Sequence, residues 1–340
     1  LVTGDGEPSL PRICDLWLQL KTEMGSGQGR GGAEQREEAL LQLAATFPFC
    51  YVPRFYEPEY QQGRFVALNR LRPEVPETIE PSLLSDLDGT PLPTRPIVPY
   101  VECVHDRISI EIMRGCPQRC RFCHAGYTKR PIGRRTVDEI VRIAEEAHRA
   151  TGNEEIGLLS LSTADYPYLP ELAKRINEVF ADRHVSISVP SMRVDKMLAH
   201  IPWMVSTVRK SGLTIAVEAA SDDMREAIRK VVTDGNLLDG VRQAYEAGWK
   251  SVKLYFMTGF PGERPEDIDG IFDISRKVSE ERFPVAGHPA QVNASVGWLV
   301  PKPHTPFQWA AQPTADYFRE VRRRLRELSS AGKSAVRIKM

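Results

Sequence analysis

Residues 104–340 contain short apolar runs that alternate with longer segments in which apolar residues recur at helical spacing. The short, β-branched runs predict six strands, and the longer segments predict six helices. We place the strands at 107–112, 156–161, 185–190, 213–218, 251–257 and 291–299, and the helices at 136–150, 167–181, 202–211, 222–247 (interrupted near Gly235), 265–281 and 314–330. Six alternations favour parallel pairing with the helices outside, and they are too few for an eight-unit closed barrel.

Residues 1–95 have a different pattern. Ser9 is a candidate cap for a helix over 11–23, and a second helix is predicted over 33–46. Prolines then recur every few residues up to Pro99, which predicts extended structure with few regular elements. We therefore expect an N-terminal domain with an extended linker over 1–98 and a larger α/β domain over 99–340.

Composition changes this picture little. The 340 residues include 45 basic and 45 acidic side chains, so the net charge gives no sign of nucleic-acid binding. No apolar run reaches the ~18 residues of a transmembrane helix, and the first residues lack the pattern of a signal peptide. These features predict a cytoplasmic protein that does not enter a membrane.

Three cysteines follow the first predicted strand within eight positions: Cys116, Cys120 and Cys123. A loop this short can direct three thiolates to one centre, and iron–sulfur clusters are held by such ligands. A structural zinc site normally has a second pair of Cys or His ligands, and His124 is the only nearby candidate. Zinc and three ordinary buried cysteines remain the alternatives, whereas six cysteines in 340 residues are too few for a disulfide framework.

These cysteines, with Phe122 before the last of them, resemble the signature of the radical S-adenosylmethionine (SAM) superfamily. The resemblance implies a partial (β/α)6 TIM barrel in which Cys116, Cys120 and Cys123 hold a [4Fe-4S] cluster. It also implies that SAM chelates the fourth iron, and that Phe122 borders the cofactor. A reduced cluster in this family cleaves SAM to methionine and a 5′-deoxyadenosyl radical, which abstracts hydrogen from a substrate.

The ends of the second and third predicted strands extend the resemblance. Ser162, Thr163 and Asp165 stand where the family often has a Gly-Gly-Glu-like segment that receives the SAM amino group. Their alternative role is to cap the following helix. Arg193, in a Ser-x-Arg-x-Asp stretch, resembles the arginine near the SAM carboxylate in the methylthiotransferase-like branch. A surface salt bridge from Arg193 to Asp195 is the alternative.

The last three predicted strands also end in matching residues. Glu218 closes an apolar strand and needs hydrogen-bond donors, which the family supplies through the ribose hydroxyls of SAM; Arg225 or Lys230 could pair with it instead. Gly259 and Gly262 resemble a G-x-P-G-E segment, although a plain β–α turn also explains them. Val300 precedes a segment similar to the P-x-TPF element that borders the adenine.

The N-terminus resembles the last strand and helix of a cobalamin-binding-like Rossmann domain, because Gly4-Asp5-Gly6-Glu7 precedes the first helix. Such domains precede the core in one branch of the superfamily. The chain has no D-x-H-x-x-G segment, which carries the cobalt-ligating histidine there. A strand–turn–helix without a cofactor is the alternative, so cobalamin binding stays open.

Three functions remain compatible with the sequence. The first is a radical SAM enzyme, with an external flavodoxin- or ferredoxin-type electron donor, that modifies RNA or protein, for example by methyl transfer. Methylthio transfer would need a second cluster, and only three cysteines are clustered. The second is an iron–sulfur electron-transfer protein that does not cleave SAM. The third is an RNA-binding accessory protein that would use the basic stretches 129–135 and 319–326, which also fit solvated helix and loop faces.

Overall fold

The computed structural model describes residues 1–23, 32–101, 106–188, 213–331 and 335–340. The chain divides into two compact units, Leu1–Thr90 and Pro91–Met340. Each unit is described below by itself. No helix in the described ranges combines the length and apolar character needed to cross a bilayer.

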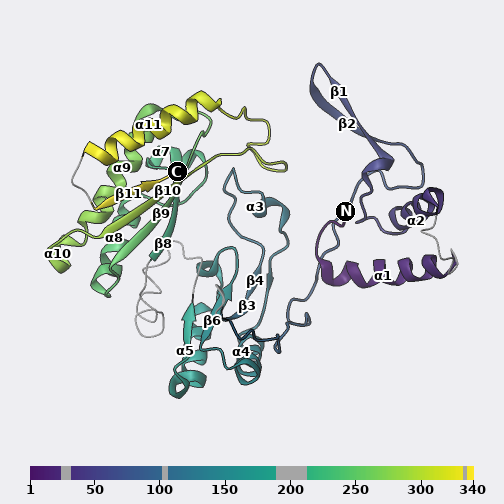
Figure 1. Ribbon diagram of the computed structural model, residues 1–340, viewed down its shortest axis with the longest axis horizontal. Helices are drawn as coiled ribbons and strands as arrows, with labels where there is room; N and C mark the ends of the chain where they lie inside the picture. Colours follow the sequence, from purple (N-terminus) through teal and green to yellow (C-terminus); the bar gives the residue numbers. More distant parts are fainter. Residues whose placement is uncertain (24–31, 102–105, 189–212, 332–334) are drawn as a thin grey trace. The chain divides into compact units, whose positions relative to one another are not determined.

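The first unit contains two helices and a β-hairpin (Figure 1). Its elements are α1 (Gly6–Glu23), α2 (Ala33–Thr46), the 3-10 turn η1 (Pro53–Phe55), and the antiparallel strands β1 (Tyr56–Gln61) and β2 (Arg64–Arg70). The prediction that Ser9 caps the first helix is wrong: α1 begins at Gly6, and buried Ser9 lies within it, donating to the carbonyl of Asp5 at 2.7 Å. The hairpin was not predicted, because its strands are largely exposed on both faces.

The strands of the second unit form two parallel sheets. One has the order β3-β6-β7 and the other β8-β9-β10-β11. Their bounds are β3 Ile108–Glu111, β6 Glu155–Leu159, β7 Ser186–Ser188, β8 Leu213–Glu218, β9 Ser251–Thr258, β10 Gln291–Trp298 and β11 Val336–Lys339. A short antiparallel pair, β4 (Met113–Arg114) and β5 (Gly133–Arg134), flanks the cysteine segment. All six predicted strands are present, and β11 is an additional parallel strand.

Helices follow the strands as expected. They are α3 Ala125–Thr128, α4 Val137–Thr151, α5 Leu169–Phe180, α7 Asp222–Ala227, α8 Asp234–Glu246, α9 Pro265–Glu280, α10 Phe283–Ala286 and α11 Ala315–Ala331, with 3-10 turns η2 Thr163–Asp165 and η3 Ala181–Arg183. Thr136 caps α4 by accepting from the backbone N–H of Glu139. The helix predicted over 222–247 is interrupted as expected and forms α7 and α8, but the break lies at 228–233 and Gly235 is inside α8. The helix predicted over 202–211 lies outside the described residues.

Each sheet buries one face against helices. In the second sheet, alternate residues such as Ile215, Leu254 and Val296 join an apolar core with residues of α8, α9 and α11, and Figure 1 shows these helices along one face of that sheet. In the first sheet, Ile110 and Leu158 pack with residues of α4 and α5. Parallel strands with helices outside confirm the predicted fold class, a partial (β/α)6 TIM barrel.

Candidate cofactor site at the strand ends

The cysteine segment follows β4 as a tightly turned loop. Gly115 opens it with φ +86°, and a Cβ atom there would lie 2.5 Å from the carbonyl oxygen of Lys129. A Cβ on Gly126 would lie 2.7 Å from the carbonyl oxygen of Gln118. Both positions therefore need glycine, because a Cβ atom at either one would push the two arms of the loop apart.

Arg130 braces this loop from inside. Its guanidinium donates to the carbonyl of Gly126 at 2.8 Å, and to the carbonyls of Cys116 and Pro117 at 3.2 Å each. The backbone N–H of Cys123 donates to the carbonyl of Cys120 at 3.0 Å. The backbone that carries the three thiols is thus fixed by hydrogen bonds as well as by the glycine contacts.

The three thiols lie within electrostatic reach of one another. Cys116 is buried, and Cys120 and Cys123 are half-buried. Burial raises the pKa of the Cys120 thiol, the nearby Lys230 ammonium opposes this shift, and the charges of Cys123, Glu218 and Cys116 add to it. The end of β8 therefore lies close to the cysteine loop.

No group of three His, Cys, Asp or Glu side chains in the described ranges is arranged to hold a single metal ion. A cluster makes a different demand, because each thiolate binds a different iron and the sulfur atoms are more widely spaced. Three thiols on one such loop could supply three of the four ligands of a [4Fe-4S] cluster. The residues present therefore fit such a cluster with one iron left for another ligand.

Glu218 ends β8 in an unusual conformation. The β8–β9 register shifts between Ala216 and Glu218, and Glu218 has φ +71°. Its carboxylate lies 3.6 Å from the Lys230 ammonium, and the two side chains are only 16% and 15% exposed. Burial raises the pKa of Glu218, and Lys230 partly offsets this. Of the two partners considered from the sequence, Lys230 is the one that pairs with Glu218.

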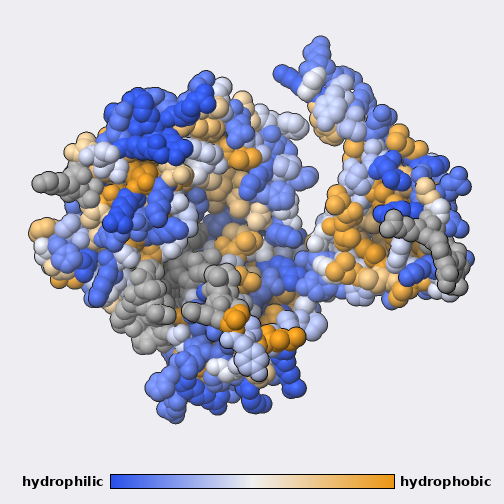
Figure 2. Space-filling model, viewed as in Figure 1, coloured by the Kyte–Doolittle hydropathy of each residue, from blue (hydrophilic) through white to orange (hydrophobic). Residues whose placement is uncertain are grey.

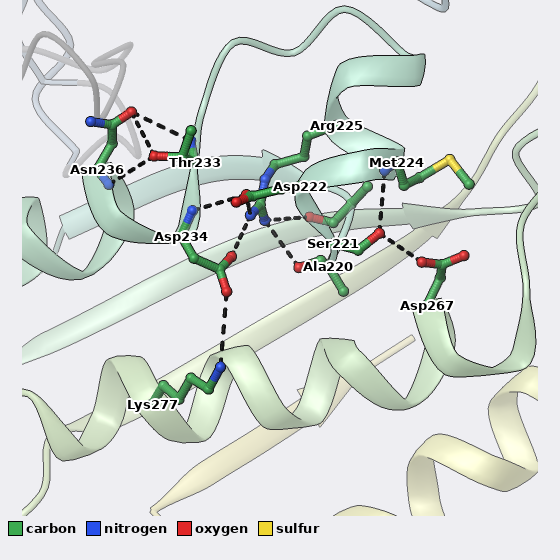
Figure 3. A network of polar contacts seen from close by, with 11 residues as sticks. Ala220, Ser221, Asp222, Met224, Arg225, Thr233, Asp234, Asn236, Asp267 and Lys277 are labelled. Atoms are coloured by element: carbon green, nitrogen blue, oxygen red, sulfur yellow. Dashed lines mark hydrogen bonds and ion pairs between the residues drawn. The ribbon is translucent and has the colours of Figure 1, made fainter.

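Arg225 instead fixes the backbone around this strand end (Figure 3). Its side chain is 1% exposed, and it donates to the carbonyls of Ala219 and Ala220 at 3.0 and 3.1 Å. It also pairs with the carboxylates of Asp222 and Asp234, at the N-terminal ends of α7 and α8. One buried guanidinium therefore ties the end of β8 to both helices that follow it.

The residues after β6 bond to the cysteine loop. The carboxylate of Asp165 accepts from Ser162 Oγ at 2.8 Å and from Gln118 Nε2 at 2.9 Å. The hydroxyl of buried Thr163 is 2.8 Å from that of Ser160. Asp165 thus joins the second strand end to the loop between Cys116 and Cys120, a contact in which Gln118 was not predicted to take part.

The glycines after β9 have different surroundings. Gly259 has φ +94°, and its Cβ position faces Phe318 of α11 at 3.1 Å. Its N–H donates to the Glu263 carboxylate at 2.6 Å. Gly262 has φ +80° and open space where a Cβ would stand.

Two further residues were predicted for this site. Val300, after β10, is 53% exposed, and Arg193 lies outside the described residues.

An apolar cluster joins the strand ends. Phe260 contacts both Phe122 of the cysteine loop and Phe307 after β10, with ring centroids 6.0 and 6.4 Å apart. The cluster also contains Ala219, Met224, Met257, Ile228 and Leu299. The N–H of Arg121 adds a hydrogen bond of 3.0 Å to the carbonyl of Ile228. The cysteine loop and the ends of β8, β9 and β10 therefore meet in one place, as predicted for parallel strands.

Part of this chain is similar in sequence to proteins of a known superfamily. Residues 110–274 match the profile of the Radical SAM superfamily. An uncharacterised protein of Methanocaldococcus jannaschii is 35% identical over 199 residues, which cover 58% of this chain and 42% of that protein. The ribosomal protein uS12 methylthiotransferase RimO of Thermosipho africanus is 27% identical over 186 residues, 51% of this chain and 42% of RimO. The chain thus spans less than half the length of these relatives.

Solved structures were also compared. The radical SAM methyltransferase TsrM from Kitasatospora setae aligns with a TM-score of 0.47 and 17% identity over 59% of this chain and 35% of TsrM. Coproporphyrinogen III oxidase (HemN) from Escherichia coli aligns with a TM-score of 0.45 and 16% identity, over 66% of this chain and 52% of HemN.

The chain contains a radical SAM domain, so the predicted family is confirmed. Domains of this superfamily bind a [4Fe-4S] cluster and SAM, and they are enzymes. Two supporting residues were not predicted: Gln118 bonds to Asp165, 47 positions later, and Arg130 bonds to backbone carbonyls of the cysteine loop.

Proposed function

We propose that this chain is a radical SAM enzyme in which Cys116, Cys120 and Cys123 hold the [4Fe-4S] cluster. The observation that carries the proposal is the meeting of the three-thiol loop with the Glu218–Lys230 pair. When bound, the cluster and SAM together supply a 5′-deoxyadenosyl radical by reductive cleavage. The chain's own residues position these groups and keep water away from them.

Each strand end has a role in this proposal. Glu218 accepts hydrogen bonds from the ribose hydroxyls of SAM, and Lys230 beside it offers a cation to the SAM carboxylate. Ser162, Thr163 and Asp165 line the side that receives the amino group, while Phe122 and Val300 border the adenine. Arg193 is proposed as a second partner of the carboxylate. Gly259 and Gly262 let the loop after β9 turn beside the cofactor.

The finer features of the reaction belong to the same proposal. We infer an external electron donor of the flavodoxin or ferredoxin type, a cytoplasmic location that protects the cluster from oxygen, and transfer of a methyl group to RNA or protein. The first unit is proposed to be the remnant of a cobalamin-binding-like domain. The chain has no D-x-H-x-x-G segment, which is consistent with a remnant that has lost cobalamin binding.

Anaerobic reconstitution with iron and sulfide, followed by SAM and a strong reductant, tests the proposal. We expect a cubane EPR signal that SAM perturbs and release of 5′-deoxyadenosine. Cys120→Ala should abolish cluster loading, whereas Cys14→Ala, at an exposed thiol of the first unit, should not. A fully loaded wild-type cluster that releases no 5′-deoxyadenosine would refute the proposal and favour electron transfer.

A further inference from the structure

The sheet β8–β11 has two faces of different character. Residues such as Val217, Val252 and Val336 alternate along the strands and pack into the core beneath the helices. The residues between them face the other way. On that opposite face, which we call the polar face, lie Thr214, Ala216, Lys253, Tyr255, Met257, Asn293, Ser295, Gly297, Arg337 and Lys339.

Strand register places the basic residues of the polar face in two neighbouring rows. Lys253, Asn293 and Arg337 are partners across β9, β10 and β11. The next row toward the carboxyl edge contains Tyr255, Ser295 and Lys339 in the same order. Lys253 and Arg337 are thus two strands apart, about 10 Å, and Arg337 and Lys339 are about 7 Å apart along β11.

The cations of this face are exposed and unpaired within the part of the chain that the structure describes. Lys253, Arg337 and Lys339 are exposed, and none of them has a carboxylate partner among the described ion pairs. The four strands contain a single acid, Glu218, which pairs with Lys230. The ammonium of Lys253 lies 4.6 Å from the ring centroid of Tyr255, and that ring is 38% exposed.

The basic stretches noted in the sequence are used differently. On α11, Arg319, Arg323 and Arg324 pair with acids of α11 and α9, and Figure 2 shows the hydrophilic surface over this helix. In the other stretch, Arg130 braces the cysteine loop and Arg135 is buried, donating to the carbonyl of Glu111. Paired or buried cations are poor ligands for a further anion. Arg134, Arg322 and Arg326 are exposed and have no carboxylate partner among the described ion pairs, but only the cations of the polar face lie in strand rows beside an exposed aromatic ring.

We propose that the polar face binds the phosphates of an RNA substrate. The proposal deepens the proposed function and rests on it, because the candidate cofactor site lies at the carboxyl ends of these same strands, where Glu218 ends β8. Three cations spread over about 10 Å suit more than one phosphate. The exposed Tyr255 ring, with the amide of Asn293 and the hydroxyl of Ser295, offers stacking and hydrogen bonds to a base. An acidic peptide would use the charges but not the ring.

The test is a fluorescence anisotropy titration of the reconstituted full chain with labelled decauridine RNA at several salt concentrations. Arg337→Gln with Lys339→Gln should weaken binding about tenfold and lower the slope of log affinity against log salt by about 1.4, because each lost phosphate contact on a single strand contributes about 0.7. Lys253→Gln should lower that slope by about 0.7.

The matched control is Arg322→Gln with Arg326→Gln, which removes the same charge from exposed positions of α11. It should change the affinity less than about twofold, as expected for charges outside the binding face. Equal losses in the two double variants, tighter binding of labelled decaglutamate than of RNA, or no RNA binding would each overturn the proposal. Release of 5′-deoxyadenosine by the wild type without RNA tests the proposed function separately.

Discussion

The ammonium of Lys230 lies 3.6 Å from the carboxylate of Glu218, and both charges act on the half-buried thiol of Cys120, the ammonium lowering its pKa and the carboxylate raising it. The two residues are joined by a segment that runs from the end of β8 through α7. A charge pair that is only about 15% exposed is costly unless it has further partners. The carboxylate and ribose hydroxyls of SAM would be such partners.

Replacing Lys230 with Met should therefore weaken SAM binding by at least about tenfold, because a lost charged hydrogen bond costs about 1.5–3 kcal/mol. Glu218→Gln should weaken it as well, and neither variant should lose its iron. Equilibrium dialysis with SAM and iron analysis of the reconstituted variants measure both quantities. Lys250→Met, at an exposed position before β9, is the control. Unchanged SAM affinity in both variants would remove this pair from the site.

Replacing Arg130 with Gln should lower the iron bound per chain after reconstitution. The substitution leaves three carbonyls of the cysteine loop without their donor, and each unsatisfied buried group costs about 1–3 kcal/mol. Arg134→Gln changes an exposed neighbour and should keep the wild-type iron content. Full and equally fast cluster loading in the Arg130 variant would contradict the bracing role.

Replacing Arg225 with Met should lower the free energy of unfolding by roughly 3 kcal/mol, because two carboxylates and two carbonyls lose a buried cation. Urea denaturation followed by circular dichroism measures this change. Arg242→Met removes an arginine that pairs with Asp239 and Glu281 and is 44% exposed, so its cost should stay below about 1 kcal/mol. Similar costs for the two variants would show that burial does not determine the effect.

The sequence predicted the parts of this fold that have a regular apolar pattern. The β8 segment Leu213–Glu218 alternates buried and less buried residues, and the helix predicted over 33–46 matches α2 in both bounds. The β1–β2 hairpin has no such pattern, since β2 is exposed at all but one position. β11 is only four residues long and pairs with a strand about 40 residues earlier. Strands that are very short, or that are polar on both faces, have too little hydrophobic periodicity to be predicted from the sequence.

The candidate site could be predicted only in part for a related reason. The cysteines lie within eight positions, so their spacing alone indicates a common ligand. Lys230 was only one of two possible partners for Glu218, because the choice depends on how α7 turns. A glycine in a motif indicates that space is needed there, but not which residue limits that space. A Cβ atom on Gly259 would lie 3.1 Å from the ring of Phe318, which is 59 positions later.

Alanine variants at two glycines with similar φ angles distinguish the cost of backbone strain from the cost of a steric clash at Cβ. Gly115 and Gly262 have φ of +86° and +80°, but only Gly115 has a backbone oxygen at its Cβ position. Both alanine variants should pay the strain of a positive φ, roughly 1 kcal/mol. Gly115→Ala should additionally displace the cysteine loop and reduce cluster loading, which iron analysis measures. Equal iron contents in the two variants would show that the loop tolerates the shift.

Glu263 accepts hydrogen bonds from the N–H of Gly259 and from the hydroxyl of Tyr317. Burial raises the pKa of Glu263 above its usual value of 4.5, although these bonds oppose the shift. Burial and the bond to Glu263 also raise the pKa of Tyr317. A carboxyl group with a raised pKa in the folded protein favours folding while it is protonated. That contribution is present below about pH 4.5 and is lost as the pH rises through the raised pKa.

Glu263→Gln keeps an acceptor for both donors but cannot ionise, so its free energy of unfolding should increase relative to wild type as the pH rises from 4 to 8. Urea denaturation across that range measures this gain, which should be largest once the wild-type carboxyl group is ionised. For Glu320→Gln, the free energy of unfolding should instead decrease relative to wild type as the pH rises over the same range. Arg323 lowers the pKa of Glu320 on the exposed side of α11, so the wild type gains stability above the usual pKa and the variant lacks that gain. The same pH dependence in both variants would show that neither carboxyl group has the environment assigned to it.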